Sequence, residues 1–188
     1  MTIEWAKSLV AAGLTDDVVA ELLELVRHGS DDRAEMAAWT FAFGDIPPDL
    51  RSDTLRGLLD VVTDTDRHAE LRGQAAEAVA QQLEFSDNTD PLRQAAEAAL
   101  IELLSDDSPI VRFWGAFGLG TLKTRAALPL LEALAGDNTP VPRWWTVGEE
   151  AADVIEWIEG RVPPGRVGTG ATRHPADPPS PPRADDTT

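Results

Sequence analysis

Apolar residues recur along this chain at intervals of three and four, and acidic residues, proline and glycine interrupt the pattern at regular distances. The pattern is clearest over residues 106–134, where one apolar helix is predicted to end near Leu122 and a second to cover residues 127–134. Two helices joined by so short a break must lie antiparallel, and small residues such as Ala116 and Gly120 let them pack closely. Such a pair has too little core to be stable alone, so we expect it to stack on copies of itself.

The same pattern predicts helices over most of the chain up to residue 160. Their ranges are 2–12, 16–28, 30–44, 47–62, 71–83, 90–104, 106–122, 127–134 and 147–158. Thr15 is predicted to cap the second helix, and the acidic pairs at residues 16–17, 31–32 and 106–107 are expected to stabilise helix starts. The first two helices lack the small residues of the later pairs, which favours a role as a terminal cap.

The later helix pairs form an internal repeat. Aligning their first helices on the small residues places Glu35, Leu71, Val111 and Val147 at one position, at intervals of 36, 40 and 36 residues. A period of this size with two helices per unit is typical of solenoids. We therefore predict an all-α fold, an α-solenoid of antiparallel helix pairs with about four repeats and an N-terminal capping pair.

The unit at residues 106–134 resembles HEAT repeats, in particular the short bacterial type also found in phycocyanobilin lyases. The residues that carry the resemblance are Pro109, Val111, Arg112, Ala116, Leu119, Gly120, Leu122, Leu128, Pro129, Leu130 and Leu131. The likeness extends over residues 30–160. It implies a right-handed superhelix whose second helices line the concave face, and an Arg112 side chain that supports the stack by reaching an acidic residue of a neighbouring repeat.

The chain changes character after Gly160. Residues 162–188 contain seven of the fourteen prolines and no aromatic residue. Such a segment buries too little apolar surface to offset the entropy of ordering it. We therefore predict two parts, a HEAT-like solenoid domain over residues 1–161 and a disordered, proline-rich tail over residues 162–188.

The charge of the chain limits its partners. The formal net charge is −17, and all of the excess lies on residues 1–161, which carry 30 acidic and 13 basic residues. A body of this kind repels phosphate backbones and attracts basic surfaces. This argues against the basic groove of HEAT-like alkylpurine glycosylases and against nucleic acid as a partner. The acidity can also serve only to keep a small protein soluble, and the sequence leaves both interpretations open.

Residue patterns typical of catalysis, cofactors and metals are missing. The chain has no cysteine, no phosphate-binding glycine loop, and three histidines far apart in sequence. Glu24 and His28 share a helix face, but no two further metal ligands can be assigned to them. We predict no catalytic, cofactor-binding or metal-binding residues. With neither a signal peptide nor a long apolar segment, a soluble cytoplasmic protein without membrane contact is expected.

Tryptophan usage is the least ordinary feature of the chain, with six Trp and no Tyr. Trp39 fits a core position. Trp144 and Trp145 lie in a long connector, residues 137–146, beside Arg143, and two adjacent side chains cannot readily face one buried side. One interpretation is that one of them is exposed and contacts a partner, since Trp and Arg are enriched in interface hot spots. The interpretation that we favour is that both cover the open C-terminal end of the stack.

These observations favour a non-catalytic scaffold that binds a basic or mixed-charge protein, including the class of immunity proteins that mask a basic active site. The candidate partner-binding residues are Trp114, Arg143, Trp144 and Trp145, together with Asp17, Glu21, Glu24, Asp53, Asp60, Glu97 and Glu132 on the acidic face. The alternative, by analogy with the phycocyanobilin lyases, is a lyase or lyase subunit. The sequence does not decide the oligomeric state.

Overall fold

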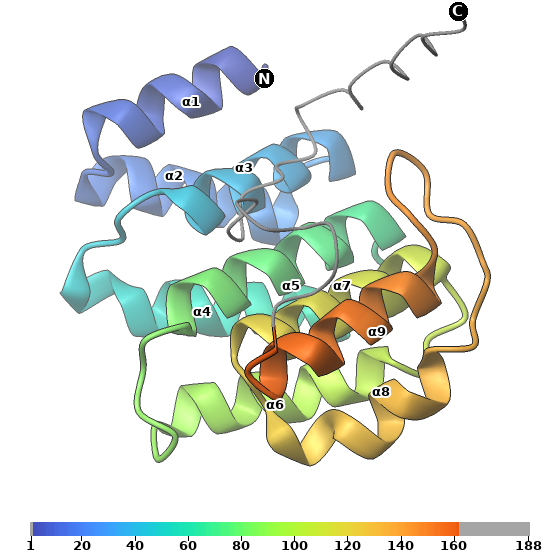
Figure 1. Ribbon diagram of the computed structural model, residues 1–188. Coiled ribbons are helices and arrows are strands. Elements are labelled where there is room, and N and C mark those ends of the chain that lie inside the picture. The colour runs from blue at the N-terminus through green and yellow to red at the C-terminus, as the bar shows by residue number, and fades with distance from the viewer. Residues whose placement is uncertain (1, 162–188) are drawn as a thin grey trace, which may run out of the picture.

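The computed structural model describes residues 2–161, and their regular elements are helical (Figure 1). The predicted tail, residues 162–188, lies outside the described residues. The helices are α1 (Ile3–Ala12), α2 (Asp16–His28), α3 (Asp31–Phe43), α4 (Pro48–Thr63), α5 (Ala69–Leu83), α6 (Pro91–Leu103), α7 (Pro109–Thr121), the 3₁₀ turn η1 (Arg125–Ala127), α8 (Leu128–Leu134) and α9 (Val147–Ile158).

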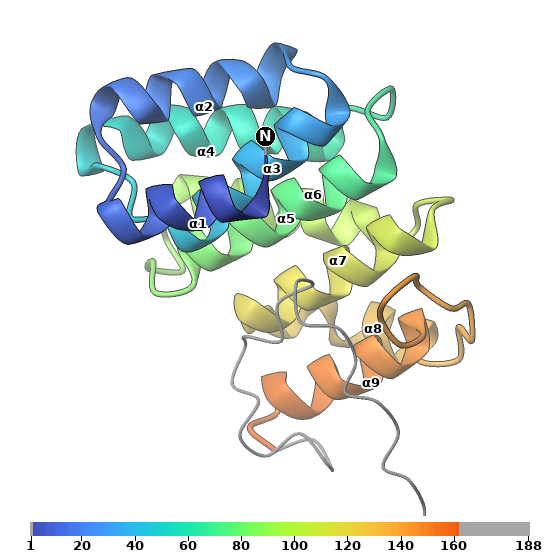
Figure 2. The same cartoon turned by 90° about the horizontal axis from the view of Figure 1, so that it is seen from above.

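The helices form two layers. In the first-helix layer, α1, α3, α5, α7 and α9 pack side by side in chain order. In the second-helix layer, α2, α4 and α6 pack in the same way, and α8 packs against α9. Figure 2 shows the order from α1 and α2 at one end to α8 and α9 at the other. The all-helical fold with consecutive helices packed together is confirmed, while the antiparallel pairing within each repeat, the handedness and the number of repeats stay predictions.

Most helix starts agree with the predicted ranges to within two residues, but α7 begins at Pro109, so the acidic pair at residues 106–107 precedes the helix and does not lie in its first turn as expected. The caps also differ in detail. Pro residues occupy the first turns of α4, α6 and α7, where a missing N–H costs nothing. Thr146 and Glu149 form a reciprocal capping box at α9. The expected cap at Thr15 is wrong in one respect, because Thr15 has the N-cap position of α2 but its side chain makes no capping hydrogen bond. Instead, the carboxylates in the first turn of α2 complement the partial positive charge of the helix dipole at this end.

Helix α5 is the centre of the core. Every residue from Leu71 to Ala80 is buried, and the helix packs against α3, α4, α6 and α7. Small residues on α5, among them Ala75, Ala76 and Ala78, allow these close approaches. Three polar side chains are also buried on this helix, namely Arg72, Gln74 and Glu77.

Arginine side chains connect neighbouring repeats. Arg72 donates from Nε to the carbonyl oxygen of Val62 at 3.1 Å and forms a 2.8 Å ion pair with Asp106. In the next repeat, Arg112 forms a 2.8 Å ion pair with Asp137 and also donates to the carbonyl oxygens of residues 106 and 107. The structural role predicted for Arg112 is therefore confirmed, and Arg72 plays the same role one repeat earlier.

Candidate functional site

The acidic residues predicted to bind a partner are spread over the second-helix layer. Asp17, Glu21 and Glu24 lie on α2, Asp53 and Asp60 on α4, Glu97 on α6 and Glu132 on α8. All are exposed except Glu97, which is half-buried and pairs with Arg93 at 3.1 Å; Asp53 pairs with Arg56 at 2.9 Å. The other five form no ion pair with residues 2–161. They make a diffuse acidic surface and do not converge on one point.

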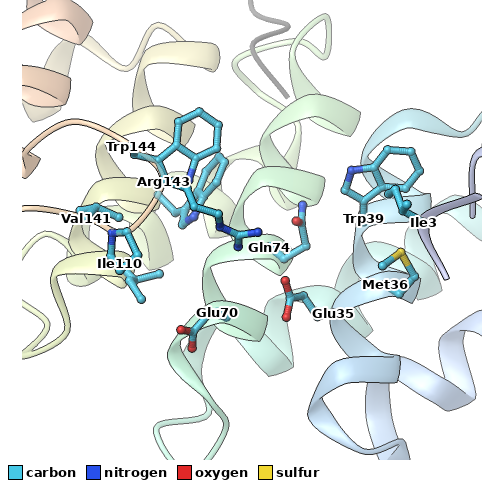
Figure 3. Close-up of a pocket in the computed structure, with 12 residues that line it drawn as sticks. Ile3, Glu35, Met36, Trp39, Glu70, Gln74, Ile110, Val141, Arg143 and Trp144 are labelled. Atoms are coloured by element: carbon cyan, nitrogen blue, oxygen red, sulfur yellow. The ribbon is translucent and has the colours of Figure 1, made fainter. Parts of the chain in front are cut away.

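A pocket of 410 Å³ lies on the other layer, where the sequence did not place the partner face. It is formed by α1, α3, α5 and α7 together with the connector, residues 137–146 (Figure 3). We call it the first-helix pocket. Its lining residues are Ile3, Glu35, Met36, Trp39, Glu70, Gln74, Ile110, Trp114, Val141, Pro142, Arg143 and Trp144.

The connector folds back on itself and so forms one wall of this pocket. Pro140 and Thr146 form an antiparallel bridge, and the turn at its tip is closed by a 3.0 Å hydrogen bond from the Trp144 N–H to the Val141 carbonyl oxygen. Arg143 has φ +68° at the third position of this turn, a conformation that usually requires glycine or asparagine. The strained turn holds Arg143 and Trp144 at the pocket, where Figure 3 shows both side chains on the side opposite Trp39.

The two tryptophans of the connector both pack on α7. Their rings lie 5.6 Å from the ring of Phe113, and Trp144 also lies 5.4 Å from Trp114. Trp145 donates from Nε1 to Glu150 at 2.7 Å. The expectation that adjacent Trp side chains cannot face the same side is wrong, because Trp144 closes a turn and the alternation of an extended strand does not apply. Both rings are half-buried, and Trp144 lines the first-helix pocket.

Glycine at position 73 shapes the floor of the pocket. A Cβ atom at Gly73 would lie 2.3 Å from Cδ1 of Trp114, well inside van der Waals contact. The missing side chain therefore lets the Trp114 indole pack directly against α5. Trp114 is only 6% exposed, and it joins the rings of Phe113, Phe117 and Trp144 in one aromatic cluster.

We expect Gly73→Ala to displace Trp114 and to lower the free energy of unfolding by about 1–3 kcal/mol, the usual cost of overpacking a core. The displacement is measured as a change in tryptophan emission and in the indole N–H resonance of Trp114, and the stability by urea unfolding. Gly136→Ala is the matched control, because a Cβ atom there meets nothing within 4 Å. Equal effects of the two substitutions would show that Trp114 does not depend on Gly73.

The charged side chains that line the pocket differ in whether they already have a partner. Glu35 is half-buried and makes no hydrogen bond or ion pair with residues 2–161. Burial raises the pKa of Glu35, the positive charge of Arg143 opposes this shift, and the nearby carboxylates of Glu70 and Asp32 add to it. Glu70 lies 2.6 Å from Nδ1 of His68. Because Arg143 also lacks an ion pair within the described residues, the opposite charges face the pocket without joining.

Gln74 lies at the base of the pocket and is only 6% exposed. Its Nε2 donates to the carboxyl group of Glu77, which is buried one turn further along α5. No donor from residues 2–161 reaches the amide oxygen of Gln74. Figure 3 shows this side chain pointing into the space between Trp39 and Trp144.

A larger hollow of 610 Å³ lies where the turns after α3 and α5 meet, next to Phe85, whose side chain is 92% exposed. Some of its polar side chains have partners, whereas those of Asp45 and Glu84 have none within residues 2–161. Arg51 donates to the carbonyl oxygen of Gln82, Gln82 donates to two carbonyl oxygens of residues 41 and 44, and Asp90 caps α6. The first-helix pocket is the better candidate site of the two, because it combines carboxylate and amide oxygens with three tryptophan rings, whereas no tryptophan lines the larger hollow.

Sequence reasoning found part of this site. Trp114, Arg143 and Trp144 were predicted candidates and line the pocket together, whereas Trp145 lies behind it against α9. Glu35, Glu70 and Gln74 were missed. One signal was present, because Gln74 and Trp114 lie 40 residues apart at equivalent positions of consecutive repeats and therefore share a face. Trp39 is buried as predicted, but its edge also lines the pocket.

Within residues 2–161, no three potential metal-ligand side chains come together, and none of the helices has both the length and the apolar character needed to cross a bilayer.

Comparison with known proteins identifies the repeats. The searches of curated proteins and of solved structures each found no match. Resemblance to the phycocyanobilin lyase type therefore stays a prediction. The family of HEAT repeats matches residues 55–152, just over half of the chain. This protein belongs to the HEAT-repeat family.

Proposed function

We propose that this protein is a non-catalytic scaffold that binds a basic or mixed-charge protein partner. HEAT repeats commonly serve as protein-interaction scaffolds. The observation that carries the proposal is the first-helix pocket, where side chains from α1, α3, α5, α7 and the connector meet in one open hollow. Such a surface depends on the stacking of several repeats, which is how solenoids build their binding faces.

The acidic charge of the protein supports the proposal that its partner is a basic or mixed-charge protein. Residues 1–161 carry an excess of acidic groups, and five exposed carboxylates of the second-helix layer form no ion pair within the described residues. Long-range attraction of this kind accelerates encounter with a basic protein and weakens as salt screens it. An inhibitor that masks the basic active site of another protein is one member of this class.

Affinity capture with the full-length protein tests the proposal. We expect a basic or mixed-charge protein to be retained in stoichiometric amount at about 50 mM salt and to be reduced at about 300 mM, because the Debye length shortens. Two variants locate the contact. One is Glu35→Gln/Glu70→Gln in the pocket, and the other neutralises Asp17, Glu21, Glu24, Asp60 and Glu132 on the second-helix layer. If the parent protein retains no protein at either salt concentration, the scaffold function is refuted.

A further inference from the structure

The first-helix pocket offers hydrogen-bond acceptors that no described residue uses. Within residues 2–161, the Glu35 carboxylate is half-buried without a hydrogen bond or ion pair, and the Gln74 amide oxygen has no donor although this residue is only 6% exposed. Glu70 adds a second carboxylate on the same wall, held against His68 at 2.6 Å. Partly desolvated acceptors of this kind are matched by a ligand that brings several N–H donors and a positive charge.

The opposite walls of the pocket are aromatic. Trp39 on α3, Trp114 on α7 and Trp144 on the connector line it, and Figure 3 shows Trp39 and Trp144 on opposite sides of Gln74. The indole ring is the aromatic side chain that attracts cations best, and a planar guanidinium also stacks on it. The carboxylates of the pocket favour a positively charged ligand, and the indole rings beside them favour a ligand that is also flat.

We propose that the first-helix pocket binds the guanidinium group of an arginine side chain presented by the protein partner, an inference that rests on the scaffold function proposed above. The volume of 410 Å³ accommodates this side chain together with adjoining backbone. Arginine fits better than lysine, because its five N–H donors in one plane can serve Glu35, Glu70 and Gln74 while its faces contact indole rings.

Arg143 competes for the same position. Its side chain reaches over Glu35 and Glu70 in Figure 3, yet it forms no ion pair with residues 2–161. Its charge acts on Glu35 nonetheless, because it opposes the burial-induced rise in the pKa of that carboxyl. An incoming guanidinium must share the pocket with this like charge or displace it. Removing the charge of Arg143 should therefore tighten binding, whereas removing that of Glu35 should weaken it.

The test uses the full-length protein and three synthetic eight-residue peptides in which glycine alternates with arginine, with lysine, or with citrulline, the uncharged isostere of arginine. Binding is followed by tryptophan emission and by the indole N–H resonances. We expect the arginine peptide to bind most tightly and the citrulline peptide to bind at least about tenfold more weakly, a factor that corresponds to about 1.4 kcal/mol. If citrulline binds as tightly as arginine, the proposal is refuted.

Matched variants place the contact. Glu35→Gln and Glu70→Gln are each expected to raise the dissociation constant of the arginine peptide about tenfold. Glu102→Gln, with the same charge change at an exposed position of α6, should leave it within about twofold. Arg143→Gln should tighten binding more than Arg56→Gln, which removes the same charge from α4. Equal losses in Glu35→Gln and Glu102→Gln would overturn the site and assign binding to the acidic surface as a whole.

The two proposals fail separately. Capture of a partner that is unaffected by Glu35→Gln/Glu70→Gln, together with no preference for the arginine peptide, would refute the pocket and leave the scaffold function standing. Specific binding of the arginine peptide without any captured protein would support the pocket and refute the scaffold function. Melting temperatures of the variants show that each remains folded, and Glu70→Gln provides the second measurement should Glu35→Gln unfold.

Discussion

Replacing Arg72 with alanine is expected to lower the free energy of unfolding by about 3–5 kcal/mol, the range for removing one partner of a buried ion pair. The Arg72 side chain is 7% exposed and that of Asp106 is 15% exposed, so the remaining carboxylate loses its counter-ion where water compensates poorly. The substitution also removes the donor to the carbonyl oxygen of Val62, at the end of α4. Urea unfolding of parent and variant measures the difference.

Arg56→Ala is the control for this experiment. Arg56 also pairs with an aspartate, Asp53 at 2.9 Å, but the two side chains are 61% and 74% exposed. A pair in water contributes little, so its loss should change the free energy of unfolding by no more than about 0.5 kcal/mol. Similar effects of Arg56→Ala and Arg72→Ala would contradict the structural role assigned to Arg72.

The second large effect that we expect is a dependence of the free energy of unfolding on pH, caused by Glu77. Its side chain is only 3% exposed on α5, its partner within residues 2–161 is the amide of Gln74, and burial raises its pKa to about 7. The unfolded chain ionises this group near the ordinary value of 4.5. The contribution of Glu77 to stability is therefore fully present below pH 4.5, decreases between pH 4.5 and about 7, and stays constant above that.

Glu77→Gln should remove this dependence, because an amide cannot ionise and its oxygen can still accept from Gln74. We expect the difference in unfolding free energy between variant and parent to shift in favour of the variant by about 3 kcal/mol from pH 4 to pH 8. Urea unfolding at several pH values gives this difference directly. The other carboxylates titrate equally in both proteins, so their contributions cancel.

Glu21→Gln on the exposed face of α2 provides the matched control, and its difference from the parent should be almost independent of pH. A Glu77→Gln variant that is equally or less favoured at pH 8 than at pH 4, relative to the parent, would show that Glu77 is ionised in the folded protein at neutral pH. In that case a counter-charge or water must reach it.

The sequence predicted the stack well, because its signals are local. The range 16–28 was predicted from one apolar stripe and its flanking residues, and α2 spans Asp16–His28. Periodicity is sufficient for features of this kind, since each helix depends on residues that are close in sequence. The inter-repeat role of Arg112 was implied by the resemblance to HEAT repeats, and its ion pair with Asp137 confirms it.

The candidate site could be predicted only in part, because it depends on how separate elements meet. Glu35 on α3 and Gln74 on α5 line the same pocket because of the angle at which these neighbouring helices pack. The repeat spacing in the sequence does not give this packing angle. The placement of Trp144 depends on the positive φ of Arg143, an unusual conformation for this residue. The acidic residues were correctly assigned to four separate helices, but the partial burial of Glu97 and its ion pair with Arg93 follow only from the packed structure.

The turn at Arg143 lies apart from the ion pairs that link the repeats. It forms the tip of the connector between α8 and α9 and is closed by its own hydrogen bond, whereas the ion pairs of Arg72 and Arg112 are made with Asp106 and with Asp137 at the base of the connector. Surface loops tolerate changes of sequence and length better than packed helices do. Related chains can therefore acquire a different ligand preference by exchanging the tip of this loop while the helical stack beneath it remains the same.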